Sequence, residues 1–168
     1  MKKMKIPTKP GTAFGGGFYA GRFFIGTQPY ALIVAPKDEG QIEPMPWNSS
    51  LKNVTGATSY CDGMANTMAM AKAGSALAKQ VLKLRIGGFK DWHLPSRLQL
   101  LIAYHELATA KAFAPEAKEA FDCAWYWSST QHAEDAGYAW LQGFSDGYQF
   151  SNHKVNKWRA RAVRTIKL

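Results

Sequence analysis

The sequence lacks the features that define membrane proteins and disulfide-rich secreted domains. It contains no apolar run approaching the roughly 18 residues that a membrane-spanning helix needs. Only two cysteines occur among 168 residues, Cys61 and Cys123, and neither lies in a CxxC pair or near a histidine at metal-ligand spacing. We therefore expect no disulfide framework and no metal site, but two free, buried thiols in a reducing compartment. A single bridge between them is the alternative.

The amino-terminal residues, MKKMKIPTKPG, are basic but lack the apolar segment of a secretion signal. We therefore expect the chain to be synthesised in the cytoplasm without a signal peptide and to have no membrane span. Appearance outside the cell would need another route, such as association with a virion.

No run of five basic residues occurs, although the formal net charge is +9, from 21 Lys and Arg against 12 Asp and Glu. A basic surface attracts anions, and its binding to them weakens with salt. The partners that fit are an acidic protein, an anionic glycan or nucleic acid, and the charge is densest within residues 2–9 and 154–167. The alternative is a basic protein with scattered charges that bind nothing in particular.

The chain does contain enough apolar material for one folded domain, because 46% of its residues are hydrophobic and six are tryptophan. Residues 1–13 read as an irregular arm, in which Pro7, Pro10 and Gly11 oppose regular structure. Residues 14–168 read as a single domain.

Apolar periodicity and turn residues predict the secondary structure of this domain. The expected elements, in chain order, are a β-hairpin in 14–36, a polar loop in 37–54, one long or two abutting helices in 56–84, a helix in 96–108, a short helix in 115–121, and strands in 124–129, 137–144, 148–150 and 158–166. Glu116 and Glu119 are expected to face outward from the short helix. The three glycines 15–17 indicate a bent or closely approached strand, because no Lys-Ser or Lys-Thr follows them as in a phosphate-binding loop.

The segment 87–101, GGFKDWHLPSRLQLL, carries the strongest local signal. Pro95 disfavours a helical conformation at Leu94, and Ser96 precedes Gln99 by the three residues of a capping box. An apolar run follows directly. The segment therefore predicts a helix that begins after Ser96.

Four sequence words occur in an order that resembles the DUF1566 family. They are Asp91–Arg97 (DWHLPSR), Tyr126–Thr130 (YWSST), Ala139-Trp140 with Phe144 and Gly147, and Arg159–Arg164 (RARAVR). The resemblance covers residues 56 to 168. His93 stands where the family usually has Arg, and Gln99 stands where it usually has Glu.

The resemblance implies an α+β fold of the C-type-lectin-like and formylglycine-generating-enzyme-like kind, with helices packed on a small, twisted, mainly antiparallel sheet. It also implies an origin among bacterial surface proteins and phage proteins. Amino- and carboxyl-terminal strands are expected to be adjacent. Arg164 shares a strand face with Ala160 and Ala162, so it is expected to have a carboxylate partner, either Asp91 or Asp122.

No set of residues predicts catalysis, a cofactor or calcium binding. Ser128, Ser129, His132 and Asp135 lie close in sequence, but the serines lack the GxSxG turn of a nucleophile. His105 and Glu106 do not form an HExxH zinc motif, since no second histidine follows. Formylglycine-generating relatives need two active-site cysteines close together late in the chain, and this sequence has no cysteine after Cys123.

A binding surface is predicted instead between the last two expected strands, where aromatic rings, amides and cations alternate. Its residues are Tyr148, Phe150, Asn152, His153, Lys154, Asn156, Lys157 and Trp158. The alternative is that Tyr148, Phe150 and Trp158 are core residues of an ordinary hairpin. The predicted function is a non-enzymatic ligand- or partner-binding protein, such as a phage tail-associated receptor-binding component. The alternative is an intracellular phage effector that binds a host protein or nucleic acid through its basic surface.

Overall fold

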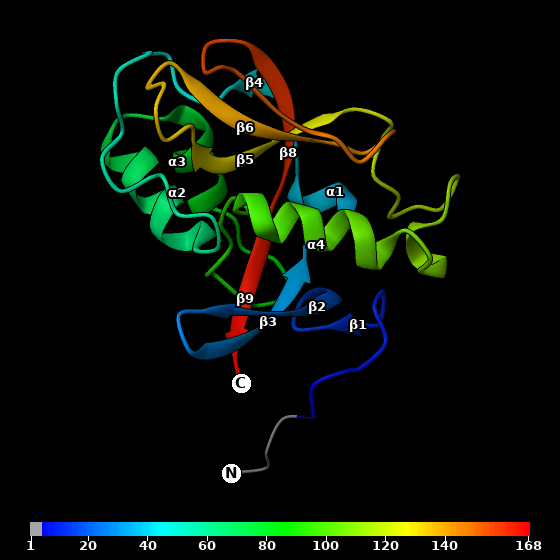
Figure 1. Ribbon diagram of the computed structural model, residues 1–168. Helices are drawn as coiled ribbons and strands as arrows, with labels where there is room; N and C mark the ends of the chain where they lie inside the picture. The colour runs from blue at the N-terminus through cyan, green and yellow to red at the C-terminus, as the bar shows by residue number, and fades with distance from the viewer. Residues whose placement is uncertain (1–4) are drawn as a thin grey trace.

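The computed structural model describes residues 5–168 and shows an α+β protein with two β-sheets (Figure 1). The four-stranded sheet has the order β1-β2-β3-β9, and the five-stranded sheet has the order β4-β8-β5-β6-β7. The elements are β1 Ala13–Phe14, β2 Gly17–Ile25, β3 Gln28–Val34, α1 Lys37–Gly40, β4 Gln41–Pro46, α2 Gly63–Lys72, α3 Ala76–Leu82, α4 Arg97–Leu107, a 3-10 helix Lys111–Phe113, β5 Trp125–Gln131, β6 Tyr138–Gly143, β7 Gln149–His153, β8 Lys157–Arg161 and β9 Val163–Lys167.

The predicted hairpin forms the centre of the four-stranded sheet. β2 and β3 pair antiparallel from Phe18–Val34 to Ile25–Gln28, and β9 adds to the other edge of β3. The expected adjacency of amino- and carboxyl-terminal strands is therefore confirmed. A Cβ added to Gly17 would lie 2.2 Å from the Val34 carbonyl oxygen, so a glycine is needed where these strands approach. Of the expected arm, residues 1–4 lie outside the described residues, and Gly11 N–H donates to the Tyr19 carbonyl.

The predicted helices form where capping residues begin them. Asp62 accepts a hydrogen bond from Ala65 N–H at the start of α2, and Ser75 accepts one from Ala78 N–H at the start of α3. Gly74, at φ +93°, separates the two helices. The capping box of α4 is present in both directions, from Gln99 N–H to Ser96 Oγ and from Ser96 N–H to Gln99 Oε1.

The segment 37–54 is not the plain loop that its polarity predicts. It contains α1 and β4, and β4 forms an edge of the five-stranded sheet by pairing with β8. Trp47 follows β4, is fully buried, and donates from Nε1 to the Ser128 carbonyl. Prolines within β4 conceal it from pattern analysis, because proline is unusual in strands other than edge strands.

The helix predicted in 115–121 is wrong. A 3-10 helix precedes this segment, Glu116 adopts a left-handed conformation with φ 71°, and turns replace the helix. Glu119 does not face solvent as expected but is buried, and its Oε2 lies 3.1 Å from Arg161 Nη2. Glu119 thus serves as the carboxylate partner of a buried guanidinium, a role that helical periodicity does not reveal.

The final strand predicted in 158–166 is divided into β8 and β9. Ala162 lies at the break, where its N–H donates to Gly40 and its carbonyl accepts from Ala35, so the chain passes from one sheet to the other (Figure 1). The predicted single sheet is therefore two. Arg164 binds Asp91 through two hydrogen bonds of 2.8 Å, which confirms the first of its two expected partners.

The two cysteines are free, as expected, but the prediction that both are buried is wrong. Cys123 is exposed, and Cys61 is half-buried with its sulfur 3.9 Å from Ser59 Oγ. Within residues 5–168, no helix is both long enough and apolar enough to cross a membrane.

Candidate functional site

The predicted surface of residues 148–158 is only partly a surface. Tyr148 and Phe150 have exposed fractions of 71% and 55%, so the alternative that they are core residues is wrong for them. Trp158 is half-buried and packs against the core, as that alternative states. Tyr148 and Phe150 are therefore exposed to solvent, whereas Trp158 packs against the interior.

Lys154 is wrongly predicted to contact a ligand. Its side chain is fully buried, and Nζ donates to Gln131 Oε1 at 2.6 Å and to the Lys52 carbonyl at 3.1 Å. The ammonium also lies 4.6 Å from the centre of the Trp47 ring. Burial lowers the pKa of Lys154 to about 8. Lys154 therefore fixes the connection between β7 and β8 rather than contacting a ligand.

The remaining predicted residues lie on different sides of β7. Asn152 pairs with Ala139 on one face of the sheet, and its Oδ1 accepts from Asn156 Nδ2 at 2.7 Å. His153 pairs with Tyr138 on the opposite face, and its Nε2 lies 2.8 Å from the Tyr138 hydroxyl. Lys157, the first residue of β8, is exposed. These residues do not form one continuous site.

A more ordered arrangement surrounds Arg97, the first residue of α4. Its guanidinium carbon lies 3.6 Å from the centre of the Trp140 ring and 5.7 Å from that of Tyr60. His132 stacks on Trp140 with a centre-to-centre distance of 5.3 Å and an interplanar angle of 21°. Cation–π contacts of this kind attract a guanidinium and restrict its plane.

Hydrogen bonds fix the position of Arg97 further. Its Nε donates to Gln149 Oε1 at 2.6 Å, and Gln149 Nε2 donates to the Arg97 carbonyl at 2.9 Å. The Arg97 amide donates to Thr130 Oγ1 at 3.0 Å. The capping box places Arg97 at this point, since Ser96 begins the helix. The two Nη groups donate no hydrogen bond to any group within residues 5–168.

Arg97 lies in a cleft of about 390 Å³ between the 58–60 segment, the start of α4 and the β5–β6 hairpin. Tyr60 is 47% exposed at its rim. His132 Nδ1 accepts hydrogen bonds from the backbone N–H groups of Glu134 and Asp135, which leaves Nε2 to carry the ring hydrogen. The lining residues are Thr58, Tyr60, Arg97, Thr130, Gln131, His132, Ala133, Glu134 and Trp140.

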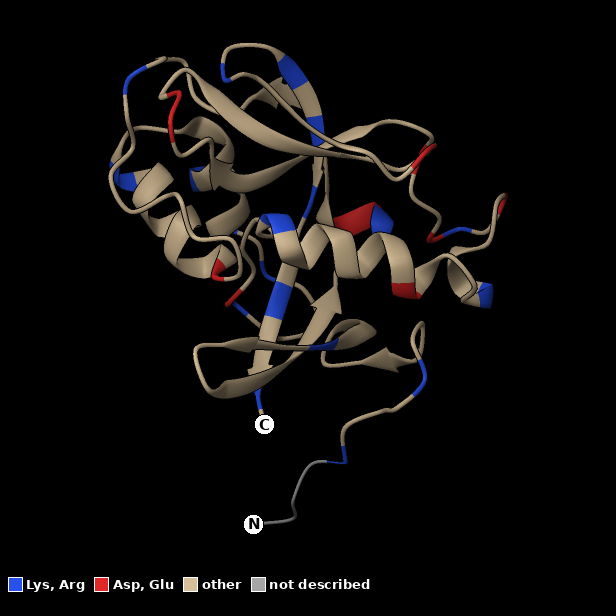
Figure 2. Ribbon diagram, in the orientation of Figure 1, with Lys and Arg blue, Asp and Glu red and all other residues tan. Residues whose placement is uncertain are grey.

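The charge of Arg97 is not neutralised as that of the other inward-facing arginines is. Arg159, Arg161 and Arg164 each form an ion pair with a carboxylate, whereas Arg97 forms none with residues 5–168. Because carboxylates neutralise these three arginines, the basic residues near the carboxyl terminus do not form a basic patch. Figure 2 shows lysine and arginine positions spread over the whole ribbon, with acidic positions among them.

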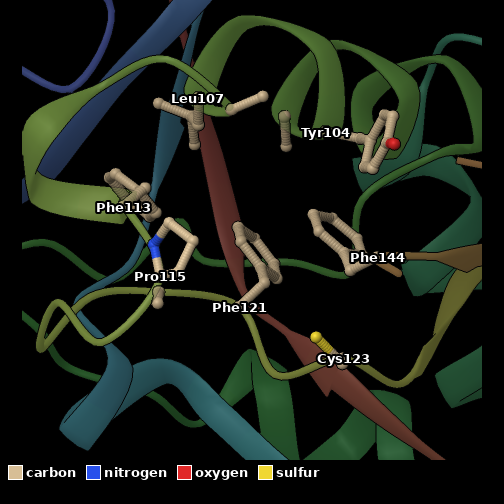
Figure 3. A pocket seen from close by; sticks show the side chains of 10 residues that line it. Tyr104, Leu107, Phe113, Pro115, Phe121, Cys123 and Phe144 are labelled. Atoms are coloured by element: carbon tan, nitrogen blue, oxygen red, sulfur yellow. The ribbon is translucent and has the colours of Figure 1, made fainter. Parts of the chain in front are cut away.

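A second cavity, of about 230 Å³, lies at the carboxyl-terminal end of α4 (Figure 3). Phe121 and Phe144 stack within it at a centre-to-centre distance of 3.9 Å, Phe113 and Pro115 lie across from them, and the Cys123 thiol lies at its edge. Its lining side chains are apolar except for the Tyr104 hydroxyl and the Cys123 thiol. It offers few groups that could orient a polar ligand, in contrast to the Arg97 cleft.

The serines that suggest a catalytic triad do not meet His132 in the structure. Ser128 is buried, and its Oγ accepts from Thr130 N–H. Ser129 Oγ donates to the Pro95 carbonyl, while His132 Nδ1 is occupied by backbone donors. A nucleophile needs a hydrogen-bonded base, and these residues stabilise strand ends instead.

Comparison with known proteins decides the family. The sequence pattern of the Lcl C-terminal domain family, which is DUF1566-like, matches residues 41–164. The chain belongs to this family. The match covers α4 and strands β4 to β8, so all the elements that build the Arg97 cleft lie within the Lcl C-terminal domain. No curated protein matches the chain.

Among solved structures, a fimbrial protein from Bacteroides ovatus ATCC 8483 is similar over 80% of this chain, with a TM-score of 0.45 and 11% sequence identity. The chain spans 35% of the length of that protein.

Sequence reasoning missed Arg97, Trp140 and Tyr60 as partners in one site. Two of them lie inside family words that also have evident structural roles, DWHLPSR for the helix start and the AW pair for a strand. Their stacking depends on contacts between residues 43 positions apart in the chain, from Arg97 to Trp140. No local spacing shows such contacts.

Proposed function

We propose that the protein is a non-enzymatic binding protein whose ligand occupies the Arg97 cleft. The observation that carries the proposal is the guanidinium of Arg97, which is held by Trp140 and Gln149 while its Nη groups have no partner in residues 5–168. An oriented, unpaired cation beside aromatic rings is the arrangement that recognises an acidic ligand. The cleft contains no nucleophile paired with a base.

The ligand class that we propose is an anionic glycan. A cleft of about 390 Å³ with a half-exposed ring at its rim suits one sugar residue of a longer chain. The narrower prediction from the family resemblance, a receptor-binding component of a phage particle with a C-type-lectin-like fold, belongs to this proposal. The same cleft would then contact a sugar of the cell surface.

Replacing Arg97 with Met is expected to weaken glycan binding at least tenfold, because Met retains much of the aliphatic stem but has no guanidinium. The measurement is binding of wild type and variant to an array of neutral, carboxylated and sulfated oligosaccharides. Arg22→Met is the matched control, since Arg22 is exposed on β2 in the other sheet.

The control is expected to bind as the wild type does. An array on which the wild-type protein binds no glycan, or on which Arg97→Met and Arg22→Met bind equally, would contradict the proposal. Unfolding temperatures of all three proteins exclude misfolding as a cause of lost binding.

A further inference from the structure

We infer that the sugar recognised in the cleft carries a single carboxylate, as a terminal uronic acid does. The inference rests on the proposed function and narrows its ligand from anionic glycans in general to one charge and one geometry. The inference is based on the side chains of Arg97 and Glu134.

The free edge of Arg97 fits a planar carboxylate. Its Nε donates to Gln149 at 2.6 Å, and its guanidinium carbon lies 3.6 Å from the centre of the Trp140 ring, so the Nη groups are the donors that remain for a ligand. A guanidinium forms two parallel hydrogen bonds with a carboxylate in one plane. Because the plane is already fixed, little conformational entropy is lost on binding.

Glu134 limits how much negative charge the cleft accepts. It lines the same cleft, and apart from Arg97 and Glu134 its lining contains no Lys, Arg, Asp or Glu. The charges of Arg97 and Glu134 sum to zero, so a ligand carboxylate bound to Arg97 gives the cleft a net charge of −1. A polysulfated chain would place further negative charge near Glu134, where like charges repel. Sugar hydroxyls, in contrast, can donate to the Glu134 carboxylate.

The other accessible groups suit a sugar ring. His132 Nε2 carries a hydrogen and can donate to a ring or hydroxyl oxygen, because Nδ1 is held by two backbone donors. The Tyr60 ring, 47% exposed, offers an apolar face with a hydroxyl at its end. Donor, acceptor and ring thus line the same cleft as Arg97.

The test is calorimetric titration of the full chain with three trisaccharides of equal length. The first ends in one uronic acid, the second is its carboxyl-reduced form, and the third carries three sulfate esters and no carboxylate. We expect the first to bind, the reduced form to bind at least tenfold more weakly, and the sulfated form to bind more weakly than the first. Glu134→Gln is expected to raise affinity for the sulfated form several-fold, since it removes the repelling charge.

Equal affinity for the uronic acid and its reduced form would overturn the inference. So would stronger binding of the sulfated form, or binding of a peptide with a free carboxyl terminus but of none of the sugars. If the sulfated form binds instead and Arg97→Met abolishes that binding, the proposed function stands and only the carboxylate is wrong. If no sugar binds at all, the proposed function fails as well.

Discussion

Replacing Glu119 with Ala is expected to lower the free energy of unfolding by about 3–5 kcal/mol, because it leaves a buried guanidinium without its carboxylate. Arg161 is fully buried, with Nε bonded to the Ala35 carbonyl and Nη2 3.1 Å from Glu119 Oε2. Burial already lowers the pKa of Arg161 to about 10. Glu119 also accepts the Lys37 N–H at 2.7 Å, so its loss leaves that donor unpaired and leaves Arg161 Nη2 only the longer bond of 3.4 Å to the backbone carbonyl of residue 119. Urea unfolding at neutral pH measures the change.

The matched control is Glu43→Ala, which breaks an ion pair at the surface. Glu43 lies 3.1 Å from Arg159, but its side chain is 82% exposed, so we expect a loss of less than about 1 kcal/mol. Replacing Arg161 with Met in the Glu119→Ala background is expected to recover part of the lost stability, since the buried charge is then removed. Equal losses from Glu119→Ala and Glu43→Ala would contradict a structural role for the buried pair.

Acidification is expected to destabilise the protein through His93, by about 3 kcal/mol between pH 6.5 and 4. Burial lowers the pKa of His93 from 6.5 to about 4, although the Asp91 carbonyl and the charges of Asp62 and Asp91 oppose that shift. Between these two values the unfolded chain binds the proton and the folded chain does not. The stabilisation is therefore complete above pH 6.5 and is lost as the pH falls toward 4.

The control for this prediction is His93→Gln, which keeps a polar side chain but cannot titrate. Its unfolding free energy is expected to fall less between pH 6.5 and 4 than that of the wild type. The reason is that unfolding of the variant takes up one proton fewer per molecule in this range. Asp91 and Asp122, whose pKa values are lowered by Arg164 and by Lys37, lose their contribution only at more acidic pH. Parallel pH profiles of wild type and His93→Gln would show that His93 is not responsible.

The parts of the fold that follow from the sequence are those determined by near neighbours in the chain. The capping box from Ser96 to Gln99 spans three residues, and the hairpin of β2 and β3 closes over a short turn, so periodicity and turn residues predict both. Arg164 was expected to need a carboxylate because a single strand in 158–166 would place it on the same face as two alanines, and Asp91 supplies that carboxylate.

The parts that could not be predicted depend on distant residues. Glu119 is buried and pairs with Arg161, 42 residues later, and helical periodicity contains no information about that pairing. Lys154 looks like a surface cation by composition, yet Gln131 and Trp47 enclose it. The Arg97 cleft could not be predicted for the same reason. The aromatic and amide composition of residues 148–158 is visible in sequence, whereas the stacking of Arg97 on Trp140 exists only in the folded chain.

The central claim is that this Lcl C-terminal domain holds an acidic sugar at Arg97 and leaves it unchanged. The most direct measurement is NMR of the protein, labelled at its arginine, tryptophan, tyrosine and phenylalanine side chains, during titration with the trisaccharide that ends in uronic acid. We predict that the Arg97 guanidinium and Trp140 indole signals shift, that Arg22 does not, and that the sugar is recovered intact. Shifts confined to Tyr148 and Phe150 or to the Phe121–Phe144 cavity, or conversion of the sugar into a product, would contradict the account.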